Sequence, residues 1–116
     1  MPSDDGAPRT RISTHILDTI TGQPAREVQV RLERQDADGW RTIGEGATDG
    51  DGRLTFGVPA HDWQAGGYRL LFAVEPYLGE SFFPEITVAF HVHDPDRDYH
   101  VPLLLSRYGY TTYRGS

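Results

Sequence analysis

The 116-residue sequence contains no cysteine and no lysine, so all 11 of its basic residues are arginine. The absence of cysteine excludes disulfides, thiol nucleophiles and thiolate-bound zinc. The absence of lysine excludes catalysis through a Schiff base on a lysine amine. Proton exchange near neutral pH is therefore left mainly to the five histidines, which are His15, His61, His91, His93 and His100.

Positive charge is also scarce. The 17 acidic residues outnumber the 11 arginines and give a formal net charge of −6, which argues against a nucleic-acid-binding surface. No apolar run approaches the ~20 residues that cross a bilayer. The first residues, MPSDDGAP, are acidic and polar, unlike the basic start and apolar run of a signal peptide. We therefore expect a cytoplasmic protein with no nucleic-acid partner and no membrane partner.

The length fits one domain. Residues 1–10 combine Pro, Gly, Ser and Asp without a periodic pattern, which predicts a disordered leader. Residues 11–116 then form the domain. A chain of this size buries only about two thirds of its extended surface on folding, so self-association would add stability.

Short segments in which apolar and polar residues alternate dominate the domain. Successive side chains of a strand point to opposite faces, so this period of two predicts half-buried strands. We expect strands at residues 12–17, 26–35, 40–44, 54–58, 68–74, 86–93, 99–105 and 108–114. Pro76 and Gly79 predict a helix of one or two turns between two of them. This pattern predicts an all-β protein, a two-sheet β-sandwich with one short helix.

Three of the histidines give only a weak indication of function. His61 lies in a loop-like stretch, where a solvated side chain is expected. His91 and His93 form an HxH pair on one face of a predicted strand, which presents either two metal ligands or two solvated residues of a polar outer face. A zinc site needs a third ligand, and His100 is the only histidine nearby. We favour solvated side chains and predict no metal site.

His15 and His100 lie among small or apolar residues of predicted strands. On composition alone, a lone histidine in such a place is more often a hydrogen-bonded structural residue than a catalyst. Arg53 follows the tight turn of residues 49–52 and by itself is expected to be a surface charge. These residues taken singly do not predict an active site.

Three sequence motifs, taken together, do predict an active site. They are ISTHILDTITGQPA at 12–25, TDGDGR at 48–53 and YHVPLLLSRYGYTTYRGS at 99–116. In this order and spacing they resemble the transthyretin-like family, and within it the enzyme branch of the 5-hydroxyisourate hydrolases. The ending YRGS is the most specific part, because hormone-carrying transthyretin lacks it. The resemblance implies a transthyretin-like two-sheet sandwich of about eight strands and a homotetramer with active sites between two dimers.

The resemblance also implies the site and the reaction. Carried onto this sequence, the catalytic residues are His15, Arg53, His100 and Ser116. The substrate-binding residues of the same terminal motif are Tyr113, Arg114 and Gly115. The reaction is hydrolytic opening of the lactam ring of 5-hydroxyisourate, a product of urate oxidation, to 2-oxo-4-hydroxy-4-carboxy-5-ureidoimidazoline. No cofactor is implied.

In the implied mechanism one histidine takes a proton from the attacking water and Arg53 stabilises the oxyanion. Which histidine is the base stays open at this point, as does the part played by the Ser116 carboxylate. Arg107 stands where the family usually has proline, and its effect on the pocket rim stays open at this point. The alternative function is a transthyretin-type carrier of a small ligand without catalysis, although a carrier does not need two histidines and an arginine beside a polar terminus.

Overall fold

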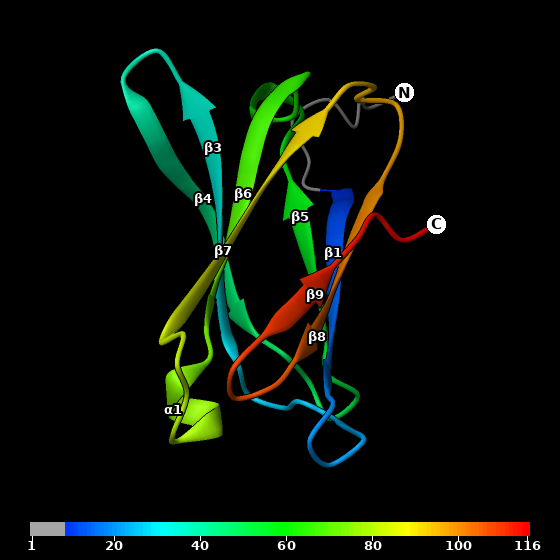
Figure 1. The fold of residues 1–116 in the computed structure, drawn as a ribbon. Coiled ribbons are helices and arrows are strands. Elements are labelled where there is room, and N and C mark those ends of the chain that lie inside the picture. The colour runs from blue at the N-terminus through cyan, green and yellow to red at the C-terminus, as the bar shows by residue number, and fades with distance from the viewer. Residues whose placement is uncertain (1–8) are drawn as a thin grey trace.

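The computed structural model describes residues 9–116, which form two β-sheets packed face to face (Figure 1). The first sheet, called the β1 sheet, contains β2 (Gln23–Pro24), β1 (Arg9–Asp18), β8 (Tyr99–Leu105), β9 (Tyr110–Thr112) and β5 (Arg53–Val58), which also pairs with β1. The second, called the β3 sheet, has the order β4 (Gly39–Ala47), β3 (Gln29–Asp36), β6 (Gly66–Ala73) and β7 (Glu85–Val92). Among the pairings, β1 with β8 is parallel and the others are antiparallel.

This architecture confirms the predicted all-β sandwich with one short helix. The helix α1 (Glu75–Leu78) has Pro76 in its first turn and ends at Gly79, whose φ of 74° favours glycine. Two elements were not predicted, the strand β2 and a 3-10 turn at Ala60–Asp62. Both are too short to produce a periodic pattern in the sequence.

The first strand begins earlier than the sequence predicted. Arg9 and Thr10, the last two residues of the predicted leader, belong to β1, where they pair with Val58 and Gly57 of β5. The rest of that leader, residues 1–8, lies outside the described residues. Between residues 9 and 116, no helix is long and apolar enough to cross a membrane.

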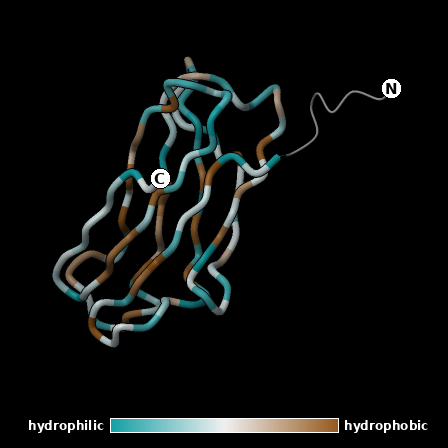
Figure 2. Tube along the Cα trace, turned by 90° about the vertical axis from the view of Figure 1, so that its right-hand side faces the viewer, coloured by the Kyte–Doolittle hydropathy of each residue, from teal (hydrophilic) through white to brown (hydrophobic). Residues whose placement is uncertain are grey.

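The core lies between the two sheets and is built from alternate residues of each strand. In β1, Ile12 and Ile16 are fully buried, whereas Ser13 and His15 point to the opposite face and are half-buried. Figure 2 shows the hydrophobic segments running along the strands. The same alternation that buries the core therefore puts the polar residues of β1 on the outer face of its sheet.

Candidate active site

Residues from four distant parts of the chain meet on the outer face of the β1 sheet. His15 of β1 is the register partner of Arg53, the first residue of β5. Ser13, two residues earlier on the same face, is the register partner of His100 in β8. The C-terminal tail returns to this place, because the backbone N–H of Gly115 donates to the carbonyl of His100 at 2.8 Å.

These residues surround a hollow of about 450 Å³. Its lining consists of Ser13, Thr14, Arg53, Thr55, Asp98, Tyr99, His100, Gly115 and Ser116. His15 lies beside it, paired with Arg53. We call His15, Arg53, His100 and Ser116 the outer-face cluster. The hollow contains imidazole, guanidinium and hydroxyl groups, a set that can move protons and stabilise negative charge.

Arg53 is placed by the turn Asp49–Gly52. The Oδ1 atom of Asp49 accepts hydrogen bonds from the backbone N–H groups of Arg53 and Asp51 at 3.0 and 2.9 Å. These two hydrogen bonds hold the pKa of Asp49 below its usual value, and the bond from Arg53 has the larger effect. Gly52 has a φ of 74°, and a β-carbon there would lie 2.6 Å from a backbone oxygen of β1. The motif TDGDGR thus encodes a turn that packs against β1 and delivers Arg53 beside His15.

The imidazole of His100 is held on two sides. Its Nδ1 atom lies 2.9 Å from the hydroxyl oxygen of Ser13, and its Cδ2 atom faces Gly115. Burial lowers the pKa of His100, and the positive charges of Arg53 and then His15 lower it further, while a hydrogen bond with the Ser13 backbone acts in the opposite direction. His100 is therefore neutral at neutral pH and able to accept a proton.

The structure divides the terminal YRGS motif into two halves. Gly115 and Ser116 line the hollow beside His100. Tyr113 and Arg114 instead line a neighbouring cavity of about 150 Å³, together with residues of β7 such as Val88 and Phe90. The first two residues of the motif therefore do not face Arg53 and His15 within one chain.

His91 and His93 lie away from the cluster, at the end of β7 in the β3 sheet. Their ring centroids are 5.3 Å apart, and both border a groove of about 780 Å³ that also contains Trp40 and Arg97. In the part of the chain that the structure describes, no three His, Cys, Asp or Glu residues are grouped to hold a metal ion. The groove is larger than the hollow, but its lining includes none of the outer-face cluster.

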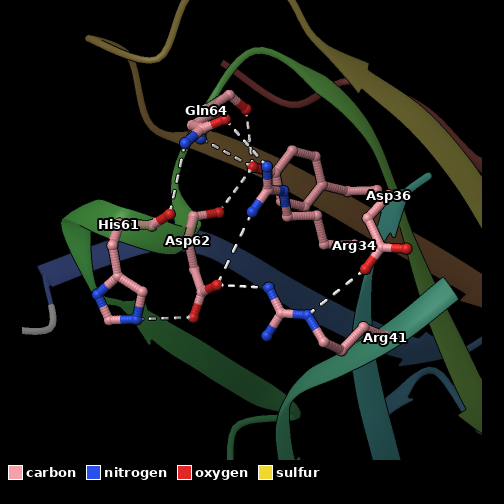
Figure 3. A network of polar contacts seen from close by, with 7 residues as sticks. Arg34, Asp36, Arg41, His61, Asp62 and Gln64 are labelled. Carbon is pink, nitrogen blue, oxygen red and sulfur yellow. Dashed lines mark hydrogen bonds and ion pairs between the residues drawn. The ribbon is translucent and has the colours of Figure 1, made fainter. Parts of the chain in front are cut away.

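His61 belongs to a separate charged network at the 3-10 turn (Figure 3). Its side chain is 73% exposed and its Nε2 atom lies 3.4 Å from a carboxylate oxygen of Asp62, which fits the predicted solvated histidine. Asp62 accepts a hydrogen bond from Arg41 at 2.6 Å and lies 3.8 Å from Arg34. The bond from Arg41 is the main reason that the pKa of Asp62 is lowered. The network ties the hairpin of β3 and β4 to this turn.

Arg107 contacts the α1 segment. Its Nη1 atom donates to the backbone carbonyls of Leu78 and Glu80 at 2.8 and 2.9 Å. It is not among the residues that line the hollow. Arg107 therefore links the end of α1 to the loop from β8 to β9.

Ser13 is the contact that sequence reasoning missed. The period of two in β1 does place it on the same face as His15, and this was visible in the sequence. The register of β1 against β8, which sets Ser13 opposite His100, is a pairing between residues 87 positions apart. No local pattern predicts such a pairing.

The two-sheet topology is that of the transthyretin-like β-sandwich proteins. The sequence model of the HIUase/Transthyretin family matches residues 12–115. The chain belongs to this family.

Similar proteins include both kinds of family member. A 5-hydroxyisourate hydrolase of Salmonella dublin is 47% identical over an alignment of 109 residues that covers 90% of this chain and 80% of the relative. The structure of Klebsiella pneumoniae 5-hydroxyisourate hydrolase has a TM-score of 0.78 at 32% identity and covers 93% of this chain and 100% of its own. The structure of transthyretin from Sparus aurata has a TM-score of 0.84 at 31% identity, and the match covers 92% of this chain and 97% of the transthyretin chain. Since the backbone resembles both, the choice between their functions depends on the site residues.

Proposed function

We propose that this protein hydrolyses 5-hydroxyisourate and opens its six-membered lactam ring to 2-oxo-4-hydroxy-4-carboxy-5-ureidoimidazoline, a step in urate degradation. The observation that carries this proposal is that Arg53, His100 and Ser116 line one hollow, with His15 paired to Arg53 beside it. It is supported by relatives named as 5-hydroxyisourate hydrolase or probable 5-hydroxyisourate hydrolase in Salmonella dublin, Caenorhabditis elegans and Mus musculus, at 47%, 41% and 39% identity.

The first step in the proposed mechanism is attack of water on the ring carbonyl. A neutral histidine of the cluster accepts a proton as the water oxygen bonds to the carbonyl carbon, which contributes about a hundred- to ten-thousandfold in rate. The carbonyl electron pair moves to oxygen and forms a tetrahedral oxyanion. Arg53 stabilises this negative charge, and a donor of that kind lowers the barrier by about 3 to 4 kcal/mol.

The second step is collapse of the tetrahedral intermediate. The carbonyl reforms, the bond from carbon to ring nitrogen breaks, and the nitrogen takes up the proton held by the imidazolium. The new carboxylic acid then ionises. The proton taken from water thus passes through the imidazole to the ring nitrogen, and the proposed reaction needs no cofactor. We assign to the Ser116 hydroxyl a hydrogen bond with the substrate or the water. Tyr113 and Arg114 line the neighbouring cavity and do not line this hollow within one chain.

We further propose that the active form is a homotetramer with its sites between two dimers. The strands β7 and β9 end their sheets, and an edge strand offers unpaired backbone groups to another chain. Several large apolar side chains are exposed, namely Ile20, Phe82, Tyr108, Tyr110 and Tyr113. Phe82 and Tyr108 are each 70% exposed, which favours burial against another subunit. A facing subunit would also close the hollow and exclude bulk water from it.

The alternative is a carrier of a small ligand. An apolar ligand needs a mostly apolar pocket with few polar groups. The hollow beside His100 instead has arginine, histidine and hydroxyl side chains in its lining. This lining suits a small substrate with many hydrogen-bonding groups, and it favours the hydrolase.

The test is the decay of freshly generated 5-hydroxyisourate with and without the protein, in the presence of a metal chelator. Absorbance reports the loss of substrate, and optical activity reports the handedness of the product. We expect decay well above the spontaneous rate, with one enantiomer formed. A folded tetramer that leaves the spontaneous rate unchanged would overturn the proposal and favour the carrier.

A further inference from the structure

The hydrogen bond between Ser13 and His100 fixes one edge of the imidazole. It joins Oγ of Ser13 to Nδ1 of His100 at 2.9 Å, across the parallel pairing of β1 and β8. A half-turn of the ring would bring Cδ2 to the hydroxyl and break this bond. Gly115 lies against the present position of Cδ2, so the ring is held between Ser13 and the C-terminal tail.

The direction of this hydrogen bond decides which nitrogen of His100 is basic. A neutral imidazole carries its proton on one nitrogen, and the other nitrogen is the basic one. Nδ1 lies against the Ser13 hydroxyl, which can accept a hydrogen bond as well as donate one. Only a proton on Nδ1, donated to that hydroxyl, leaves the lone pair on Nε2.

We propose that Ser13 is a positioning residue that keeps the proton of His100 on Nδ1 and thereby makes Nε2 of His100 the general base. This rests on the proposed function. Within residues 9–116, no hydrogen bond involves Nε2, so its lone pair is available to a water in the hollow. The assignment leaves His15, paired with Arg53, to orient the attacking water.

Three variants separate the hydroxyl of Ser13 from its volume. Ser13→Thr keeps the hydroxyl, Ser13→Val has the same shape as threonine without it, and Ser13→Ala removes it with no added bulk. Threonine and valine both suit a strand. The matched control is Thr10→Ala, which removes a hydroxyl from the same strand outside the hollow.

The first readout is steady-state kinetics. We expect kcat to fall about tenfold in Ser13→Val and Ser13→Ala with KM changed less than twofold, because the base is misoriented while the substrate contacts remain. Ser13→Thr should keep at least half of the activity, and Thr10→Ala should match the unmodified protein. A loss confined to KM in Ser13→Val would overturn the assignment.

The second readout needs no substrate. Nitrogen-15 shifts of the histidine rings distinguish a protonated from an unprotonated nitrogen, and we expect Nδ1–H for His100 in the unmodified protein and a mixture in Ser13→Val. A proton on Nε2 in the unmodified protein, or wild-type kcat in Ser13→Val, would overturn the proposal. If the unmodified protein does not hydrolyse 5-hydroxyisourate, the proposed function fails, and the ring shifts still decide whether Ser13 sets the tautomer.

The pH profile of kcat gives a third readout, since the titration of His100 depends on every charge that faces it. These groups are Arg53 on β5, His15 on β1, Asp98 in the preceding loop and the terminal carboxylate of Ser116. None of them changes in Ser13→Val. We therefore expect Ser13→Val to lower the maximal kcat of the profile strongly and to shift the pH of its acidic limb much less. A shifted limb with an unchanged plateau would contradict the positioning role.

Discussion

Gly115 lies directly against the imidazole of His100. A β-carbon at position 115 would fall 2.5 Å from Cδ2 of the ring and 3.2 Å from its Cγ. The N–H of Gly115 also donates to the His100 carbonyl at 2.8 Å. The tail passes His100 only because residue 115 has no side chain, and the position of Ser116 depends on that passage. The glycine of the YRGS ending is therefore a geometric requirement of the site.

Gly115→Ala should damage catalysis and leave the fold intact. The added methyl group must push the tail or the imidazole aside, and a displacement of about 1 Å at a reacting group costs about a hundredfold in rate. The comparison is kcat together with the thermal unfolding midpoint, which we expect to stay within a few degrees because the tail lies outside the core. Wild-type kcat in this variant would show that the tail and His100 are not in contact.

Arg53→Gln should lose about a hundred- to a thousandfold in kcat, because the oxyanion loses its cationic donor. Arg26→Gln is the matched control, since Arg26 is an exposed arginine outside the hollow. Sedimentation of both variants checks that the assembly is retained. Activity of Arg53→Gln within threefold of the control would remove Arg53 from the mechanism.

The activity should persist below the usual pKa of histidine. Since burial, Arg53 and His15 lower the pKa of His100, the neutral base remains when the pH falls through about 6.5. Activity is lost only at lower pH, where the ring takes up a proton. In Arg53→Gln one of the lowering causes is gone, so the acidic limb of the kcat profile should move to higher pH. A limb that moves to lower pH would contradict the electrostatic account of the site.

Asp62 should stabilise the fold in a pH-dependent way. Its side chain is 14% exposed and its pKa is lowered, chiefly by the hydrogen bond from Arg41. We expect Asp62→Asn to reduce the free energy of unfolding by about 1 to 2 kcal/mol at pH 7. A lowered carboxyl pKa stabilises the protein above the unfolded value of about 4, and this contribution disappears as the pH falls through the folded value.

Urea unfolding from pH 7 down to pH 3 checks this expectation. The difference in the free energy of unfolding between the unmodified protein and Asp62→Asn should become smaller as Asp62 is protonated. A matched control is Asp38→Asn, since Asp38 is exposed at the tip of the hairpin of β3 and β4 and makes no ion pair in the described residues. A difference in the free energy of unfolding that stays constant from pH 7 to pH 3 would mean that Asp62 acts through packing rather than charge.

Alternation in the sequence predicted most of the strands because it reports directly which side chains are buried. The segment 99–105 matches β8 in both bounds. The last strand is shorter than predicted, Tyr110–Thr112 in place of 108–114, because Ser106 and Gly109 close a turn through a backbone bond of 3.0 Å. The segment 40–44 is extended to Gly39–Ala47, because β4 pairs along the whole length of β3. Such limits are set by neighbouring strands and not by local periodicity.

The candidate site was predictable only in part. A resemblance of motifs predicts His15, Arg53, His100 and Ser116 as its residues, since each residue alone fits a structural or surface role. Their convergence depends on pairings between distant segments, such as His100 with Gly115, which no local pattern contains. The separation of Tyr113 and Arg114 from the hollow likewise follows from the path of the tail beside β8.

We expect the outer-face cluster to hydrolyse 5-hydroxyisourate through His100. The decisive comparison is the initial rate of 5-hydroxyisourate decay with the unmodified protein and with folded His100→Gln in the same assembly state, each corrected for spontaneous decay and measured with chelator present. We expect rapid formation of a single enantiomer by the unmodified protein and a rate at least about a hundredfold lower for His100→Gln. Equal rates for the two proteins would show that His100 does not carry the reaction.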